Sequence, residues 1–153
     1  MKITDILAEE ALVADLGGKT KDEVIVELAR VVATHHPEIN HARLVGALEE
    51  RERLNSTALG EGVAIPHGKM PGLKRVVAAF GRSRAGVDFS SLDGKPTHLF
   101  FLLVAPEDSA GIHLKALARV SRLLKDAGFR TRLLAARDRP TLYALIKEED
   151  EKF

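Results

Sequence analysis

Cysteine is absent from the 153 residues of this sequence. Its absence excludes disulfide bonds, thiolate nucleophiles and cysteine-ligated metal sites, and it fits a cytoplasmic location. Long hydrophobic segments are missing too. The longest uninterrupted apolar run, residues 99–105, is far too short to cross a bilayer, and the first residues do not resemble a secretory signal. We therefore expect a cytoplasmic protein with no direct membrane insertion.

A strong excess of either charge is missing as well, because the formal net charge is only +1. The whole molecule therefore gives no reason to expect nucleic-acid binding. The charges are unevenly distributed: residues 1–66 hold 7 basic and 12 acidic side chains, whereas residues 67–139 hold 14 basic and 6 acidic ones. A solvated surface is the simpler interpretation of the basic part. The alternative is a mildly positive surface suited to phosphoryl groups or to an acidic partner.

The length of the chain predicts one domain that spans residues 1–153. Helix and strand patterns alternate along it. We therefore expect an α/β fold, a single-domain three-layer sandwich in which a mixed β-sheet carries helices on both faces. The predicted helices cover residues 20–36, 40–53, 111–125, 130–136 and 141–148, and the predicted strands cover residues 63–65, 76–80 and 97–104.

Local signals support several of these elements. Thr20 and Asn40 are suited to cap the first two helices. The continuous apolar core of strand 97–104 indicates burial on both faces. Between the last two strands, residues 81–94 are expected to contain a hairpin with a turn at Asp93-Gly94. The charged tail, residues 147–152, is expected to fray.

Residues 60–69 are the most informative segment of the chain. A short apolar run, residues 63–65, leads to Pro66, His67 and Gly68. Proline fixes the backbone before the histidine, and glycine after it lets the chain turn and lets a ligand approach closely. We therefore expect His67 at the end of a short strand with its ring presented outward. A ring nitrogen held in this way can act as a nucleophile or as a base.

A second histidine, His113, lies in the first turn of the predicted helix 111–125, on its apolar side. Sites in α/β sheets form beyond the carboxyl ends of strands. The rings of His67 and His113 therefore meet if strands 63–65 and 97–104 are parallel neighbours. From the spacing alone, two interpretations of His113 stay open: a partner of His67, or a core histidine satisfied by a backbone carbonyl.

The other four histidines suit surface or structural roles. His35, His36 and His41 cluster at a polar connection between two helices. No acidic or histidine spacing there supports a metal site, so surface histidines are the better interpretation. His98 lies near the start of strand 97–104, where we expect a structural hydrogen bond.

Signatures of the commonest alternative chemistries are missing. The sequence has no HExxH, no GxSxG elbow, no P-loop and no GxGxxG that opens a helix. A neutral imidazole can accept a phosphoryl group and release it again, and a second histidine with a nearby arginine would stabilise the added negative charge. A metallohydrolase that uses His67 and His113 is an alternative, but no ligand carboxylate has the required spacing.

Two blocks of the sequence resemble a known family. Residues 51–60 (RERLNSTALG) and 62–69 (GVAIPHGK) resemble the signature of the fructose/mannitol-type IIA domains of the bacterial phosphoenolpyruvate-dependent phosphotransferase system. Residues 102–106 (LLVAP) and 112–114 (IHL) are similar to the second block of the same family. The resemblance covers nearly the whole chain and implies the EIIA type-2 fold.

The resemblance also implies functions for individual residues. His67 matches the phosphoryl acceptor, which takes the group from the phosphocarrier HPr or its paralogue NPr. His113 matches the second active-site histidine, and Arg51 matches the arginine that reaches the phosphoryl oxygens. Ser56 and Thr57 are further candidates for hydrogen bonds to that group. The implied enzyme is a phosphotransferase component with a covalent phosphohistidine intermediate and with no metal or organic cofactor.

The sequence leaves open where the phosphoryl group goes. The length of the chain, without a IIB or membrane IIC domain, resembles the nitrogen-regulatory (PtsN) type, which signals through contacts with regulatory target proteins. One alternative is a free-standing IIA subunit that passes the group to a IIB protein for uptake of a fructose- or mannitol-like sugar. Another is a binding module that keeps the fold without phosphoryl transfer. The presence of both His67 and His113 argues against this last alternative.

Overall fold

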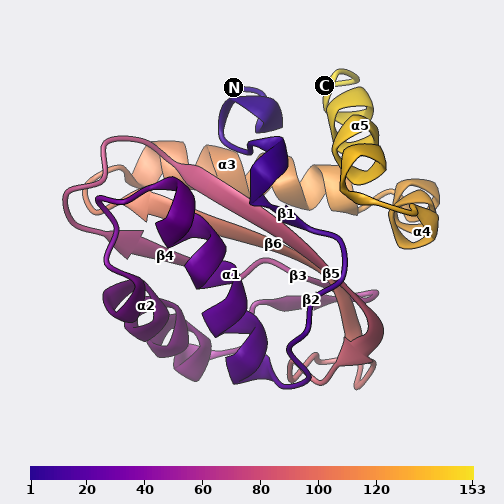
Figure 1. Cartoon of the computed structure of the whole chain (residues 1–153), viewed down its shortest axis with the longest axis horizontal. Coiled ribbons are helices and arrows are strands. Elements are labelled where there is room, and N and C mark those ends of the chain that lie inside the picture. Colours follow the sequence, from indigo (N-terminus) through magenta and orange to yellow (C-terminus); the bar gives the residue numbers. More distant parts are fainter.

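The computed structural model describes residues 1–153. Six strands form one mixed sheet that is covered by helices on both faces (Figure 1). The α-helices are α1 (Lys21–His35), α2 (His41–Leu54), α3 (Ala110–Leu124), α4 (Ala127–Ala135) and α5 (Arg139–Asp150), preceded by the short 3-10 helices η1 (Ile3–Asp5) and η2 (Glu9–Ala11). The strands are β1 (Leu12–Val13), β2 (Ala58–Gly60), β3 (Val63–Ala64), β4 (His67–Met70), β5 (Val77–Val87) and β6 (Thr97–Pro106). None of the helices combines the length and the apolar character that a membrane span needs.

The centre of the sheet is β6, and its neighbours determine where the candidate site lies. The strand order is β1-β5-β6-β3-β2, and β4 also pairs with β6. Strand β6 is antiparallel to β5 and parallel to both β3 and β4. Strands β3 and β4 therefore follow one another along the same edge of β6, and the parallel pairing on which a meeting of His67 and His113 depended is observed.

The core is built on both faces of β6. Every residue of this strand except His98 is buried, which confirms the expected burial on both faces. In Figure 1, helices α1 and α2 lie in front of the sheet and α3 lies behind it. Two edge-to-face pairs, Phe80 with Phe101 and Phe89 with Phe100, pack with ring centroids 5.7 and 5.2 Å apart. The three-layer arrangement predicted from the sequence is thus observed.

The first two helices begin where the sequence predicts. The Thr20 side chain accepts a hydrogen bond from the Glu23 amide at 3.2 Å, and the Asn40 side chain accepts one from the Arg43 amide at 3.0 Å. Each bond satisfies an amide that has no partner within its helix. Helix α2 is therefore anchored at its start, and its last turn reaches the edge of the sheet where β4 lies.

Strand β5 is much longer than predicted. The predicted strand ended at Phe80, but β5 continues to Val87 and itself forms the hairpin with β6. The expected turn at Asp93-Gly94 is present, because the Gly94 amide bonds the Ser91 carbonyl at 3.0 Å. The prediction stopped early because the continuation contains Arg82, which reads as a surface residue. Its side chain is buried and donates to the carbonyls of other elements.

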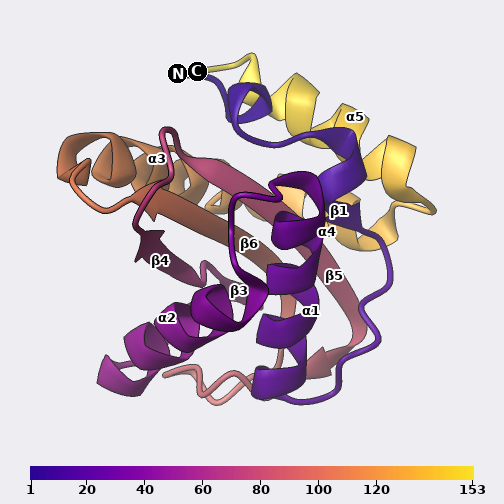
Figure 2. The same ribbon diagram turned by 60° about the vertical axis from the view of Figure 1, so that its left-hand side comes forward.

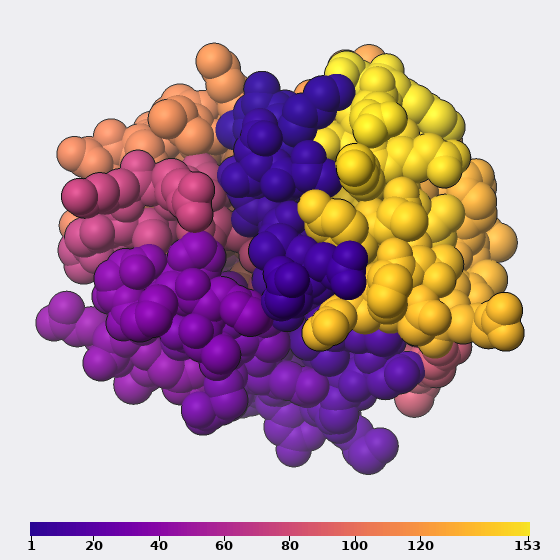
Figure 3. Space-filling model, turned by 45° about the horizontal axis from the view of Figure 1, so that its top comes forward, coloured from indigo at the N-terminus to yellow at the C-terminus, as the bar shows by residue number.

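The prediction that the tail frays is wrong. Asp150 is only 1% exposed, and one of its carboxylate oxygens accepts from the Ile3 amide at 2.7 Å. Its other oxygen lies 2.7 Å from the Arg119 guanidinium. The two ends of the chain lie side by side in Figure 2, and in Figure 3 the first residues pack against the C-terminal helices. The tail is ordered because η1 and α3 supply partners for its charges.

Candidate functional site

Three side chains from three elements meet at one end of the sheet. Strand β4 opens with His67, which pairs with Leu103 of β6. Helix α3 follows β6 and carries His113, and the last turn of α2 carries Arg51. The rings of His67 and His113 lie with their centroids 5.3 Å apart. From the sequence, the two histidines were expected to meet only if the strands are parallel. The strands are parallel and the two rings do meet.

His67 starts a strand and does not end one, which differs from the prediction. Strand β3 ends at Ala64, and the chain pairs with β6 again only from His67 onward. Pro66 lies in the gap, where it has no N–H to donate, while its carbonyl accepts from the Leu103 amide at 3.0 Å. This interruption leaves the Ile65 carbonyl free to face the His67 ring.

The hydrogen bonds of His67 define its tautomer. Nδ1 lies 2.7 Å from the carbonyl oxygen of Ile65. A carbonyl oxygen only accepts, so the proton belongs on Nδ1 and the lone pair on Nε2. Arg51 Nε donates to this Nε2 at 3.2 Å, which agrees with the same assignment. The ring therefore presents a nucleophilic nitrogen next to a guanidinium.

The Arg51 guanidinium is held from its other side by Asn55. Nη1 donates to the Asn55 carbonyl at 2.9 Å and to its side-chain oxygen at 3.0 Å. Asn55 directly follows the end of α2 and has an extended backbone. The sequence separation between Arg51 and His67 is thus closed by the last turn of α2 packing on β4.

His113 is not a core histidine satisfied by a carbonyl. Its side chain is buried, with the residue only 7% exposed, yet Nδ1 has no hydrogen-bond partner. A buried polar atom without a partner is costly, and such atoms are frequent where a ligand or a reaction needs them. Of the two interpretations that the sequence left open, the structure favours a partner of His67.

Both rings are kept neutral. Burial lowers the pKa of His67 below its usual value; the Ile65 hydrogen bond and the Glu52 carboxylate act against this, and the Arg51 charge adds to it. Burial, followed by the charges of His67 and Lys69, lowers the pKa of His113 from 6.5 to about 4. Two neutral imidazoles beside two cations form a site that is ready to receive negative charge.

An open cleft of about 440 Å³ gives access to the site. Its lining residues are Ala47, Glu50, Arg51, Leu54, His67, Gly68, Lys69 and His113. Lys69 was not among the site residues predicted from the sequence. Side chains alternate along a strand, so Lys69 lies on the same face of β4 as His67, and this spacing of two was the available signal.

The hydroxyls of Ser56 and Thr57 are directed elsewhere. Ser56 Oγ donates to the Phe89 carbonyl at 2.6 Å, and Thr57 Oγ1 bonds the buried Glu52 carboxylate. Neither residue lines the cleft beside His67. The expectation that they bond a phosphoryl group is therefore replaced by a structural role, because folding supplies each hydroxyl with a nearer acceptor.

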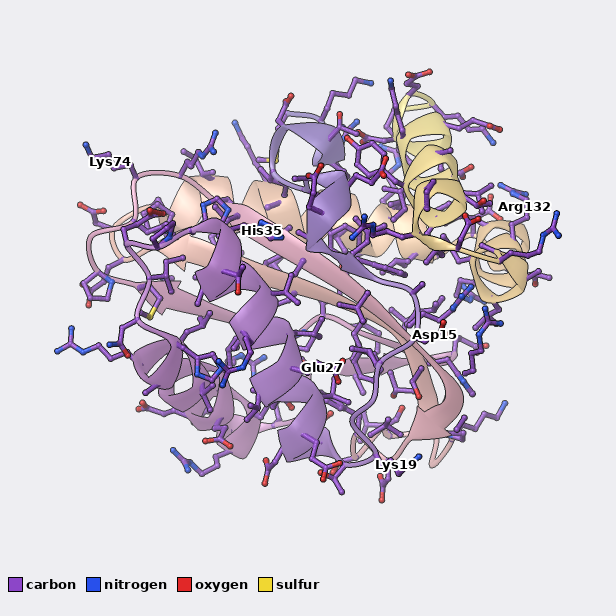
Figure 4. All side chains as sticks on the ribbon, in the orientation of Figure 1. Asp15, Lys19, Glu27, His35, Lys74 and Arg132 are labelled. Atoms are coloured by element: carbon purple, nitrogen blue, oxygen red, sulfur yellow. The ribbon has the colours of Figure 1, made fainter.

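The remaining histidines lie outside the site. His35 of α1, labelled in Figure 4, has Nε2 3.0 Å from the Glu10 carbonyl, and His41 Nε2 lies 3.2 Å from the Val26 carbonyl. His36 lies 3.5 Å from the Glu38 carboxylate. The predicted structural bond of His98 is confirmed by its 2.9 Å contact with the Ser83 carbonyl. No group of three or more His, Asp or Glu side chains is arranged to hold a metal ion.

Comparison with known sequences connects this geometry to a family. Residues 5–149 match the family described as "Phosphoenolpyruvate-dependent sugar phosphotransferase system, EIIA 2". A nitrogen regulatory protein of Bradyrhizobium diazoefficiens is 42% identical over 146 residues, which are 95% of this chain and 95% of the relative. The fructose-specific EIIABC component of Bacillus subtilis is 37% identical over 151 residues, which are 99% of this chain but 24% of that protein.

Solved structures share the fold. The nitrogen regulatory protein IIA-Ntr of Neisseria meningitidis superposes with a TM-score of 0.87 at 33% identity, covering 94% of this chain and 98% of the other. The mannitol IIA of Escherichia coli has a TM-score of 0.74 at 23% identity, covering 91% and 97% of the two chains. The predicted α/β fold is thereby confirmed.

Proposed function

The chain belongs to the EIIA type-2 family of the phosphoenolpyruvate-dependent sugar phosphotransferase system, and we propose that it is a phosphoryl carrier whose acceptor atom is Nε2 of His67. The donor is HPr or its paralogue NPr, and the transfer takes place in the cytoplasm. The observation that carries the proposal is the fixed tautomer of His67. The 2.7 Å contact with Ile65 places the proton on Nδ1 and leaves the Nε2 lone pair beside Arg51.

The proposed step exchanges one N–P bond for another. The Nε2 lone pair of His67 attacks the phosphorus of a phosphohistidine on the donor. As the new N–P bond forms, the donor's N–P bond breaks and its electron pair stays on the donor nitrogen. Nδ1 keeps its proton and its bond to Ile65, so no proton has to leave His67 during transfer. In the reverse direction, a nucleophile of the recipient attacks the phosphorus on His67, and the electron pair of the broken N–P bond returns to Nε2.

The neighbouring groups are suited to stabilise the incoming charge. Arg51 already points one N–H at Nε2, so a small rotation brings the guanidinium onto the phosphoryl oxygens. Lys69 lines the same cleft and adds a second cation. The low pKa of His113 keeps its ring neutral. The ring lies next to the His67 ring and carries no extra proton that could transfer to Nε2 of His67. These dipoles and charges are in place before the donor arrives.

A protein partner is suited to the surroundings of the cleft. Leu114 is 64% exposed next to His113, and Ile112 and Leu54 are also exposed large apolar residues. Exposed apolar side chains that rim a reactive site are typical of protein docking surfaces. Leu54 at the cleft and Ile112 and Leu114, which flank His113 along α3, are called the collar here, and they would contact the phosphocarrier that presents its phosphohistidine.

We further propose that the phosphorylation state of His67 has a nitrogen-regulatory, PtsN-like signalling role. The 42% identity to a nitrogen regulatory protein over nearly all of both chains supports this assignment. The 37% identity to a fructose-specific component supports the alternative, in which a IIB protein receives the group for sugar uptake. A regulatory module that binds targets without being phosphorylated is the remaining alternative.

The test is intact-mass measurement after incubation with phosphoenolpyruvate, enzyme I and HPr or NPr. Wild type is expected to gain one acid-labile phosphoryl group, and His67→Ala is expected to gain none. His113→Ala is expected to be labelled more slowly but still labelled, because Nε2 of His67 remains. No adduct on wild type, with the phosphorylated donor confirmed present, would overturn the carrier role and favour the binding module.

The recipient is identified in a second step. The phosphorylated protein is mixed with a fructose-type IIB protein, and loss of its label is followed by mass. Retention of the label, together with a target that binds only one phosphorylation state, supports the regulatory role. Rapid transfer to IIB supports the sugar-transport alternative.

A further inference from the structure

Next to Arg51 on α2 is a buried carboxylate that the transfer step does not use. Glu52 of α2 is only 8% exposed. The Thr57 amide donates to its two oxygens at 3.3 and 3.2 Å, and the Thr57 hydroxyl bonds Oε1. Lys21 of α1 places its ammonium 2.9 Å from Oε2. One carboxylate thus joins α1, α2 and the loop that leads to β2.

These contacts hold the segment to which Arg51 is bound. Arg51 Nη1 donates twice to Asn55, and Asn55 is only two residues before Thr57. The backbone between them is short, so Asn55 cannot move far while Thr57 stays bonded to Glu52. The guanidinium that faces His67 is therefore fixed through Asn55 and Thr57 to a buried carboxylate.

We propose that Glu52 is a positioning residue: through Thr57 and Lys21 it fixes residues 55–57, and these hold the Arg51 guanidinium against Nε2 of His67. The proposal rests on the proposed function for its kinetic consequence, but the positioning itself exists without any phosphoryl group. A shift of about 1 Å in a group that contacts a reacting centre can reduce the rate by about a hundredfold. Small loosening of this turn is therefore expected to slow transfer without changing how the donor docks.

The charge of Glu52 also acts on the His67 ring, which gives a second readout beside the contact between Arg51 and His67. Five charged or titratable groups line the cleft or act on the His67 ring from the elements around it: Glu50, Arg51 and Glu52 of α2, His113 of α3 and Lys69 of β4. Among them Glu52 raises the pKa of His67, while Arg51 lowers it. Loss of the Glu52 charge by itself lowers the pKa of His67, whereas loosening of Arg51 raises it, so Thr57→Val, which keeps the Glu52 charge, isolates the positioning effect.

The experiment compares four variants with wild type. Glu52→Gln removes the charge, Thr57→Val removes the hydroxyl and Thr57→Ser keeps it. Glu49→Gln is the matched control, because Glu49 lies one turn earlier on α2 and forms no ion pair. Nitrogen-15 NMR of the unphosphorylated protein gives the pKa of His67 and the signal of the Arg51 Nε–H group. Initial rates with phosphorylated HPr give kcat and KM.

Glu52→Gln and Thr57→Val are expected to lower kcat by about tenfold or more with KM nearly unchanged. In both, the Arg51 Nε–H signal should move and exchange faster, and in Thr57→Val the pKa of His67 should rise, because the cation that lowers it is held less closely. Thr57→Ser and Glu49→Gln should behave as wild type.

The positioning role is overturned if Glu52→Gln and Thr57→Val both keep the kcat, the Arg51 signal and the His67 pKa of wild type. If Glu52→Gln does not fold, Lys21→Met and Thr57→Val carry the same comparison. If wild type is not phosphorylated at all but the Arg51 signal still moves in the variants, the proposed function fails and the positioning stands.

Discussion

The Nε–H group of Arg51 points at Nε2 of His67 from 3.2 Å. Burial is the main cause of the lowered pKa of His67, and the Arg51 charge lowers it further, so the acceptor ring of the unphosphorylated protein is neutral. A neutral ring has the free lone pair that a nucleophile needs, and the same guanidinium is the nearest cation to the incoming phosphoryl group. One residue therefore serves the acceptor before transfer and the product after it.

Replacing Arg51 by Ala is expected to raise the pKa of His67, because a cation that opposes protonation is removed. The transfer rate, measured as kcat/KM with phosphorylated HPr, should fall by about a hundredfold, as for other lost charge-stabilising donors. Arg51→Lys should recover only part of the rate, because an ammonium cannot keep the forked bonds to Asn55 and His67. Arg53→Ala, an exposed position two residues further along α2, is the control. An unchanged His67 pKa in Arg51→Ala, measured by nitrogen-15 NMR, would contradict this reading of the contact.

The low pKa of His113 predicts a specific dependence of stability on pH. Its pKa is about 4 in the folded protein against an ordinary value of 6.5, so below pH 6.5 the unfolded chain binds a proton that the folded protein does not. Above pH 6.5 both states are neutral and the effect vanishes. The free energy of unfolding should therefore fall between pH 6.5 and pH 4, with roughly 3 kcal/mol from this residue. His67 contributes with the same sign.

Urea unfolding at pH 7 and pH 4 checks this expectation. The loss of stability between the two pH values should be smaller in His113→Gln than in wild type. His41→Gln, which changes a partly exposed histidine at the start of α2, should lose as much stability as wild type. Equal losses in wild type and His113→Gln would show that His113 titrates normally in the folded protein.

The collar of apolar residues predicts a binding defect that is separate from chemistry. Leu114→Ser removes a side chain that is 64% exposed beside His113, so stability should change by less than about 0.5 kcal/mol. The KM for phosphorylated HPr should rise by about tenfold, while kcat stays within about twofold, because the docking contact is lost in ground and transition state alike.

Leu92→Ser is the matched control for the collar. Leu92 is fully exposed in the turn before β6, whereas His67 pairs with Leu103 further along the same strand. Initial rates at varied donor concentration separate KM from kcat. An equal rise in KM for Leu92→Ser, or none for Leu114→Ser, would place the docking surface elsewhere.

The ordered tail predicts a stability effect far from the cleft. Asp150→Ala removes the carboxylate that accepts from the Ile3 amide and pairs with the Arg119 guanidinium, and breaking a buried pair in this way costs about 3 kcal/mol. Glu151→Ala, at the next and exposed position, should change the free energy of unfolding by less than about 0.5 kcal/mol. Both variants should be phosphorylated at the wild-type rate. Equal stabilities by urea unfolding would mean that the tail is not held in solution.

Much of this protein could be predicted from local patterns. Side chains that interact within their own segment can be recognised from the local sequence. Thr20 and Asn40 cap the first turns of their own helices. The apolar run of β6 indicates a strand buried on both faces. The blocks around His67 and His113 are contiguous in the sequence as well, so the resemblance to the EIIA type-2 family was visible before any geometry.

Only the tertiary structure decided what depends on partners that are distant in the chain. Arg82 is buried because the carbonyls of Ala14, just after β1, and of Leu133 in α4 accept its hydrogen bonds, and Asp150 is ordered because η1 and α3 supply its partners. The approach of Arg51 to His67 and the lack of a partner on His113 Nδ1 likewise follow from how α2, β4 and α3 pack. The local sequence around a charged residue predicts that it is exposed. Such a residue can be buried only where folding brings groups to it that offset the cost of its desolvation.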